Sequence, residues 1–237
     1  MKKKAQTILN TNFNKIYKYL FPVAIILIYF CVPIMITIIL TNSLGMDSKI
    51  IVSSIASILT LLILILIFNR TLIKQFYDFK QNWKKYMTFT VKCWAIGIVV
   101  MMVSNLIINY VIFGGNTIAG NEEKVRELLV KYPIYGLFSA AIFAPIAEEI
   151  TFRLSFKKWF KSALIFAIVT GLLFASLHLV GSYTSIKDLL YLIPYGSLGF
   201  AFGYAYFKTD NIFSTMTMHF IHNFVVYGLI IIVYLGV

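Results

Sequence analysis

The chain has 237 residues, of which 60% are hydrophobic and 13% are charged. A soluble domain averages about 45–50% apolar and about 25% charged residues, so this composition excludes an ordinary water-soluble domain and indicates a membrane protein. Lys and Arg outnumber Asp and Glu by 21 to 9. Because these charges lie between apolar runs, we expect them to face anionic lipid in a bilayer, and we predict no nucleic-acid partner.

Seven apolar runs approach the length of about 20 residues that is needed to cross a membrane. In chain order they cover residues 19–42, 50–68, 89–113, 133–153, 161–181, 189–207 and 211–235. The predicted fold class is therefore all-α, a polytopic membrane helical bundle with about seven transmembrane helices. The polar and basic stretch 69–88 is expected to be a loop between the second and third helices.

Three further features predict local structure. Residues 1–18 are basic and are expected to form a cytoplasmic tail or a short interfacial helix. Charges of both signs in residues 122–131 predict a short surface helix. The spacing of Gly199 and Gly203 indicates close packing of one helix against another.

The distribution of basic residues predicts the orientation of the chain in the cell membrane. Fifteen Lys and Arg residues fall on the same side as the N-terminus, and five fall on the opposite side. Cytoplasmic loops carry the excess of Lys and Arg. We therefore expect a cytoplasmic N-terminus and an external C-terminus.

Few ionisable side chains lie inside the apolar runs, and each is a candidate functional residue because charge within a bilayer is unfavourable. They are Glu148, Glu149, His178, His219 and His222. Glu149 and Arg153 are four residues apart, as are His219 and Asn223, so each pair shares one helix face, whereas His222 is expected to point elsewhere. Polar groups on separate helices are best satisfied by facing one another, so we expect a cluster inside the bundle.

The depths of these residues do not agree at first sight. At 1.5 Å per residue from the cytoplasmic ends, Glu148 and His219 lie about 12–18 Å deep, whereas His178 lies about 25 Å deep. The difference disappears if the helix at 161–181 starts later or is tilted. It also disappears if the fourth span is longer and bent at Pro145.

A carboxylate and an imidazole around one water can act as a general base for hydrolysis. His219 and Asn223, one turn apart, are hydrogen-bond donors that can stabilise an oxyanion. Alternatively, Glu148, His178 and His219 would hold Zn²⁺, because two His and one Glu form a known catalytic ligand set. A structural interpretation is also open: Glu149 and Arg153 can form an ion pair without catalytic function, and a buried His can serve only helix packing.

Three motifs follow one another in the second half of the chain. They read Glu148-Glu149-Ile150-Thr151-Phe152-Arg153, then Phe174-Ala175-Ser176-Leu177-His178, then His219-Phe220-Ile221-His222-Asn223. Together they resemble the E-E-x-x-x-R, F-x-x-x-H and H-x-x-x-N/D motifs of the CPBP family. This family, also called Abi, comprises CAAX-protease and bacteriocin-processing membrane peptidases.

The resemblance implies a CAAX-protease-like fold and an intramembrane peptidase. By family likeness, Glu148 and His178 would activate the water, His219 and Asn223 would stabilise the oxyanion, and Glu149 with Arg153 would support the site. The family is described as metallopeptidases, although a purely glutamate-dependent mechanism has been argued for its eukaryotic relatives. The implied division of the chain is a basic segment at 1–18, N-terminal helices and loops at 19–132, and a catalytic helical core at 133–237.

The implied substrate is a peptide or membrane protein, and maturation of a peptide pheromone or bacteriocin is favoured over CAAX processing. One alternative is a non-catalytic membrane scaffold or bacteriocin-immunity protein of the same fold. Another is a proton-coupled transporter that uses the same residues as a relay. The number of spans and the lack of an evident inverted repeat argue against the transporter.

Overall fold

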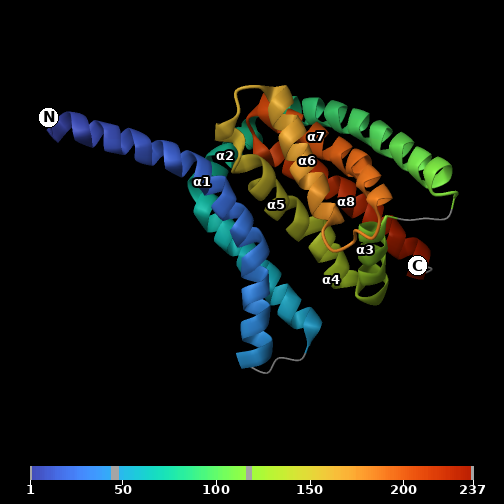
Figure 1. Ribbon diagram of the computed structural model, residues 1–237. Coiled ribbons are helices and arrows are strands. Elements are labelled where there is room, and N and C mark those ends of the chain that lie inside the picture. Colours follow the sequence, from blue (N-terminus) through green and yellow to red (C-terminus); the bar gives the residue numbers. More distant parts are fainter. Residues whose placement is uncertain (1, 44–47, 116–118, 236–237) are drawn as a thin grey trace.

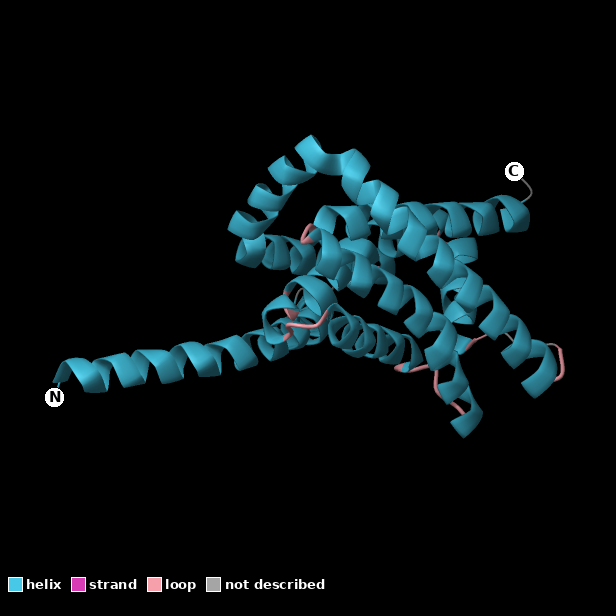
Figure 2. Cartoon of the chain, turned by 90° about the horizontal axis from the view of Figure 1, so that it is seen from above, coloured by secondary structure: helices cyan, strands magenta, loops and turns pink. Residues whose placement is uncertain are grey.

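The computed structural model describes residues 2–43, 48–115 and 119–235. Every regular element within these ranges is a helix, and no strand occurs there (Figures 1 and 2). The main helices are α1 (Lys2–Ile38), α2 (Lys49–Leu106), α3 (Gly120–Lys131), α4 (Pro133–Leu137), α5 (Ala144–Glu148), α6 (Ala163–Leu179), α7 (Leu192–Thr209) and α8 (Ile212–Leu235). Short π-helical or 3-10 segments join or extend several of them: η1 (Ile39–Ser43), η2 (Ile107–Ile112), η3 (Phe138–Phe143), η4 (Glu149–Leu154), η5 (Lys157–Trp159) and η6 (Ile186–Tyr191).

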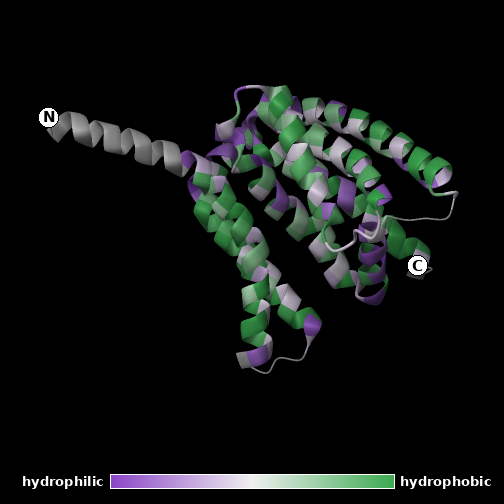
Figure 3. Cartoon of the chain, viewed as in Figure 1, coloured by the Kyte–Doolittle hydropathy of each residue, from purple (hydrophilic) through white to green (hydrophobic). Residues whose placement is uncertain are grey.

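Four helical segments of the described chain are long and apolar enough to cross a membrane. They are Lys18–Asn42, Lys49–Ile112, Pro133–Trp159 and Ile212–Tyr234. Large apolar side chains on their outer faces are exposed, including Leu66 at 66%, Val111 at 77% and Val233 at 75%. Such a surface suits lipid rather than water, and Figure 3 shows it as green along most of the α1–α2 hairpin. The predicted all-α membrane bundle is confirmed.

The predicted loop at 69–88 is wrong. Residues 49–106 form the single 58-residue helix α2, which contains both the second and the third apolar runs. The stretch 69–88 has no Gly or Pro to interrupt the helix, so its polar residues continue the backbone hydrogen bonding while most of their side chains stay exposed. The seven apolar runs therefore lie in six helical segments, of which α6 and α7 are the shortest.

Helix α2 changes direction along its length. Its first half runs beside α1, and its second half, green in Figure 1, passes over α7. In the first half the buried residues recur every four positions: Val52, Ala56, Thr60, Leu64, Phe68 and Leu72. This spacing is one stripe of an α-helix, so the first half of α2 buries a narrow face and leaves the remainder to lipid.

The basic N-terminal segment is continuous with the first span. The backbone from Lys2 onward belongs to α1, so the described part of residues 1–18 is helical, while Met1 lies outside the described residues. Figure 1 shows this end of α1 extending away from the bundle. The division of the chain at residues 18 and 132 stays a prediction.

Glycines bring α6 and α7 into backbone contact, as predicted from Gly199 and Gly203. A Cβ added at Gly199 would lie 3.0 Å from both the Cα and the carbonyl oxygen of Gly171 on α6. A Cβ at Gly203 would lie 2.7 Å from Thr170 Oγ1 and 3.1 Å from Ala167 Cα. This close approach fixes the distance between the helix that carries His178 and its neighbour.

We expect Gly199→Ala to destabilise the protein by about 1–3 kcal/mol, because the added methyl group meets backbone that cannot move aside cheaply. The measurement is thermal unfolding of the purified protein in detergent micelles. Gly228→Ala on α8 is the matched control, since a Cβ there meets nothing within 4 Å. Equal melting temperatures for the two variants would show that the glycine contact does not limit stability.

Candidate active site

The span that carries the two adjacent glutamates is not a uniform α-helix. Between Pro133 and Trp159 it alternates α4, η3, α5, η4 and η5, and the two long segments η3 and η4 are π-helical. A π-helical turn contains an extra residue, which changes the direction of the side chains that follow. Glu148 ends α5, between the two π-helical segments, and Glu149 is the first residue of the second one, η4.

Glu149 is fully buried and is bound from three sides. Its Oε1 lies 3.3 Å from Nη1 of Arg153 and 3.2 Å from Nδ1 of His219. Its Oε2 accepts a hydrogen bond of 2.9 Å from the Thr215 hydroxyl. The predicted Glu149–Arg153 pair is confirmed, and Glu149 in addition holds His219 of α8.

Arg153 is also fully buried, with 0% of its surface exposed. Its guanidinium carbon lies 4.5 Å from the centre of the Phe174 ring, and Nη2 donates to the Gly199 carbonyl over 3.4 Å. Stacking on an aromatic face suits the planar guanidinium and a lysine would not reproduce it. Arg153 thereby links η4 to both α6 and α7.

His219 lies between the two adjacent carboxylates. Its Nδ1 contacts Glu149, and its Nε2 lies 3.9 Å from Oε2 of Glu148. The Glu149 carboxylate, paired with Arg153, can only accept hydrogen bonds. Nδ1 of His219 must therefore carry a proton and donate a hydrogen bond to Glu149. This contact fixes the imidazole and turns Nε2 toward Glu148, as a carboxylate orients histidine in other catalytic sites. Phe202 supports the ring by stacking on it with centroids 5.2 Å apart.

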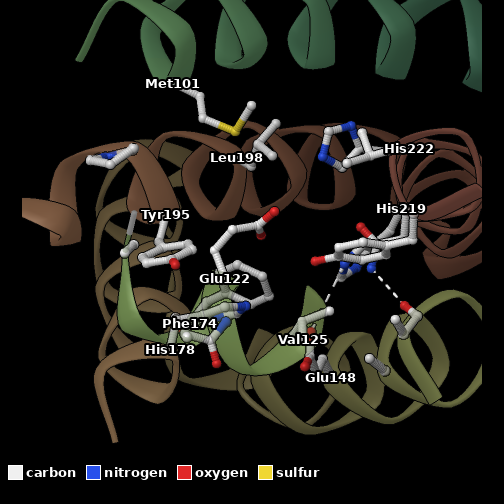
Figure 4. Close-up of a pocket in the computed structure, with 18 of the residues that line it drawn as sticks. Met101, Glu122, Val125, Glu148, Phe174, His178, Tyr195, Leu198, His219 and His222 are labelled. Carbon is white, nitrogen blue, oxygen red and sulfur yellow. Dashed lines mark hydrogen bonds and ion pairs between the residues drawn. The ribbon is translucent and has the colours of Figure 1, made fainter. Parts of the chain in front are cut away.

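Glu148 lines a cavity inside the bundle (Figure 4) and is 6% exposed. Besides His219, Glu148 has the side chain of Tyr29 in α1 as a polar neighbour. The group formed by Glu148, Glu149, Arg153 and His219 is electrically neutral when a single proton is shared between Glu148 and His219. Buried charges are tolerated best when they are balanced in this way.

His178 faces the same cavity from the other side of Phe174. Its ring centroid lies 4.5 Å from that of Phe174, whose ring lies 5.8 Å from that of His219. Nδ1 of His178 lies 2.9 Å from the Phe174 carbonyl oxygen, which can only accept, so Nδ1 carries a proton and a neutral ring leaves Nε2 as an acceptor. Tyr195 stacks on the other face of the imidazole at 4.7 Å.

His178 and Glu148 line one cavity in spite of the apparent difference in depth. The fourth span reaches Trp159 and contains π-helical turns, and α6 begins at Ala163. The histidine that contacts Glu148 is His219. Joint action of Glu148 and His178 on one water stays a prediction.

Asn223 lies one turn beyond His219 and also lines the cavity. Its Nδ2 donates 2.7 Å to the carbonyl of Ala140 in η3. One amide N–H of Asn223 is thus used to hold α8 against the fourth span, and a second N–H is available.

The prediction that His222 points elsewhere is wrong. His222 lines the cavity as well and packs against Trp94. The reason is that residues 219 and 222, three apart on a helix, are still neighbours.

The cavity has a volume of about 460 Å³ and is lined by polar and apolar side chains (Figure 4). Its lining joins α5, α6, α7 and α8 to helix α3, from which Glu122, Val125 and Arg126 reach it. Glu122 and Arg126 are paired at 3.0 Å. The predicted surface helix at 122–131 is therefore present as α3, and one of its faces covers the cavity.

The set Glu148, His178 and His219 does not fit a metal ion in this arrangement. Among the described residues, no three side chains of His, Cys, Asp or Glu come together closely enough to hold one. The rings of His178 and His219 each pack against Phe174, and they do not converge with Glu148 on one point. We therefore derive no catalytic step through a metal.

Sequence reasoning missed residues that shape the site from outside the three motifs. They are Tyr29, Thr215, Phe202, Tyr195 and Glu122. The spacing of Thr215 offered one signal, because it precedes His219 by one helical turn and so shares its face. The sequence holds no such signal for Tyr29, since an aromatic residue in an apolar run usually serves only helix packing.

Comparison with known proteins places the three motifs in one region. The model of the "Rce1-like: Type II CAAX prenyl endopeptidase Rce1-like" family matches residues 130–225. The chain is similar to the membrane-embedded CAAX protease MroQ of Staphylococcus aureus (strain USA300), at 27% identity over 143 residues, which cover 55% of this chain and 54% of MroQ. It is also similar to the putative membrane peptidase YdiL of Bacillus subtilis (strain 168), at 27% identity over 177 residues, covering 72% of this chain and 68% of YdiL. No solved structure matches the chain significantly.

Proposed function

Because residues 130–225 match the model of the Rce1-like family of CAAX prenyl endopeptidases, we propose that this multi-pass membrane protein is an intramembrane endopeptidase that uses Glu148 as its general base. One observation carries the proposal. Glu148 lines a cavity inside the bundle and lies 3.9 Å from a histidine whose other ring nitrogen is held by the buried Glu149–Arg153 pair. A helix-packing role alone does not require an oriented imidazole beside a second carboxylate.

The proposed mechanism assigns one task to each group. Glu148 takes a proton from a water molecule as that water attacks the scissile carbonyl carbon. His178 accepts a second hydrogen bond from the water through Nε2. His219, protonated at Nε2, and the second amide N–H of Asn223 donate to the developing oxyanion. The proton on Glu148 then passes to the leaving amine, which completes hydrolysis without a covalent intermediate.

Glu149 and Arg153 act as positioning residues in this mechanism. Their charges balance each other inside the bundle, and Glu149 fixes the tautomer of His219 through the Nδ1 contact. The balance also allows His219 to be protonated without leaving a net charge in the cluster.

We propose a short, membrane-associated peptide of the pheromone or bacteriocin type as the substrate. A cavity of about 460 Å³ accepts a few residues of extended chain, not a folded domain. Its mixed lining suits a peptide backbone that carries apolar side chains. We further propose a cytoplasmic N-terminus, supported by the excess of Lys and Arg on that side.

The experiment that tests the function is hydrolysis in ¹⁸O-labelled water. The purified chain is reconstituted into vesicles with a library of apolar peptides, and the products are analysed by mass spectrometry. We expect cleaved peptides with one ¹⁸O in the new carboxylate, and none with Glu148→Gln. If the chain binds peptides but releases only intact ones, the enzyme proposal is wrong and a non-catalytic scaffold or immunity protein of the same fold is preferred.

The cofactor question has its own test. We expect peptide hydrolysis to survive dialysis against a chelator with less than a twofold loss of rate, because the proposed water activation uses a carboxylate and imidazoles only. The measurement combines the cleavage rate with elemental analysis of the purified protein. A rate that is abolished by the chelator and restored by Zn²⁺ would show that Glu148, His178 and His219 rearrange around a metal.

A further inference from the structure

A second hollow lies on the outer surface of the bundle, away from the catalytic residues. It has a volume of about 650 Å³ and lies between α2, the fourth span and α8. Its lining is almost wholly apolar and includes Ile65, Ile73, Phe76, Ile146, Phe213 and Thr217. We refer to it as the α2–α8 groove. Its volume is within the range of ligand-binding pockets, and its lining suits hydrocarbon.

The α2–α8 groove and the active site use opposite faces of the same span. Ala140, Ala144 and Glu148 line the catalytic cavity, whereas Ala141 and Ile146 line the groove. The fourth span and α8 thus each present one face to the cavity and another to the groove, and the two hollows share no lining residue.

The length of the groove matches one lipid chain. Along α2 it extends from Ile65 to Tyr77, twelve residues apart, which corresponds to about 18 Å of helix. One leaflet of the hydrocarbon core is about 15 Å thick, half of the full core. The length of the groove along α2 is thus comparable with the thickness of one leaflet.

Positive charge continues the same stripe of α2 beyond the groove. Phe76, Lys80 and Lys84 follow at intervals of four residues, so they share one helix face. The ammonium group of Lys80 lies 5.8 Å from the centre of the Phe76 ring, which places it directly at the end of the groove. The ammonium group of Lys84 lies over the Trp83 ring at 5.9 Å.

The acidic residue of this segment is turned toward other partners. Asp78 accepts hydrogen bonds from Asn82, Tyr86 and Asn211, the last of which is fully buried at the start of α8. Its carboxylate therefore faces these donors, and among the described residues it forms no ion pair with Lys80 or Lys84. An apolar slot one leaflet long with two lysines at its polar end is complementary to an anionic phospholipid.

We propose that the α2–α8 groove binds one anionic glycerophospholipid of the surrounding membrane. One acyl chain lies in the groove between α2 and α8, and the phosphate is held at Lys80 and Lys84. This site is separate from the proposed peptidase site, and its occupation does not depend on catalytic activity.

The test is titration of the detergent-solubilised full chain with phosphatidylglycerol or phosphatidylcholine of identical acyl chains, followed by native mass spectrometry. We expect the first bound phosphatidylglycerol to have about tenfold higher affinity than phosphatidylcholine, on the basis of two lysines near the phosphate. In K80Q/K84Q this preference should disappear. In Thr217→Trp, or in Ile73→Trp if the former does not fold, both lipids should bind at least fivefold more weakly.

The matched control is K49Q/K187Q, which removes two exposed lysines far from the groove along the chain. It should keep the preference for phosphatidylglycerol. An equal loss in K49Q/K187Q and K80Q/K84Q would mean that only net charge matters, and it would overturn the proposal. Retention of tight binding after both Trp substitutions would place the lipid elsewhere. A farnesylated peptide is titrated in the same way. If it binds more tightly than phosphatidylglycerol, and if Thr217→Trp abolishes this binding, the groove is a substrate site instead of a lipid site.

Discussion

Replacement of Glu148 by Gln is expected to lower the rate of peptide hydrolysis by about 10²–10⁴-fold and to leave the fold intact. The amide has the same shape as the carboxyl group and can keep contacts with Tyr29 and His219. It cannot take a proton from water, so the loss should appear in kcat and not in peptide binding. The measurement is the cleavage rate at saturating peptide, with peptide affinity determined separately.

The control for Glu148→Gln is Glu123→Gln in α3, an exposed carboxylate of the same chain. It should cleave peptide at the native rate. A Glu148→Gln protein that is folded and retains more than a tenth of native activity would remove Glu148 from the role of general base. His219 would then be the next group to examine.

Replacement of Arg153 by Met should destabilise the protein by about 3–5 kcal/mol, because it leaves the carboxylate of Glu149 buried without its positive partner. Both side chains are 0% exposed, so water cannot compensate for the loss. The contact of Arg153 with the Phe174 ring is lost at the same time. The measurement is the free energy of unfolding in mixed micelles, with a denaturing detergent as the variable.

A double variant separates charge balance from catalysis. In Glu149→Gln/Arg153→Met no unpaired charge remains, so most of the lost stability should return. Activity should stay low, since His219 no longer donates to a carboxylate and its Nε2 is no longer directed at Glu148. If the double variant recovers stability and activity together, the pair serves packing alone.

Most of the helical architecture and the cluster of site residues could be predicted from the sequence, because intramembrane charge is rare enough to single out a few positions. The Glu149–Arg153 pair followed from the spacing of four residues, and the structure confirms it. The proximity of Glu148, His178 and His219 to one cavity followed from the same reasoning. The catalytic role of each residue stays a prediction.

Other features could not be predicted, for identifiable reasons. Hydropathy separates apolar from polar residues, but it does not show whether the backbone breaks between them, so the continuous helix α2 was interpreted as two helices and a loop. The amphipathic helix α3 was interpreted as surface because its charges resemble those of a solvent-exposed helix, although one face covers the cavity. The position of Tyr29 beside Glu148 depends on how α1 packs, which no local pattern reports.

The two π-helical turns of the fourth span make the spacing of its residues as important as their identity. Each extra residue rotates everything beyond it by about 100° relative to a regular helix. Deletion of a single residue within η3 would allow a regular α-helical turn there, yet it would rotate Glu148, Glu149 and Arg153 away from His219 and Phe174. This segment should therefore tolerate conservative replacement of its apolar side chains far better than any change in its length.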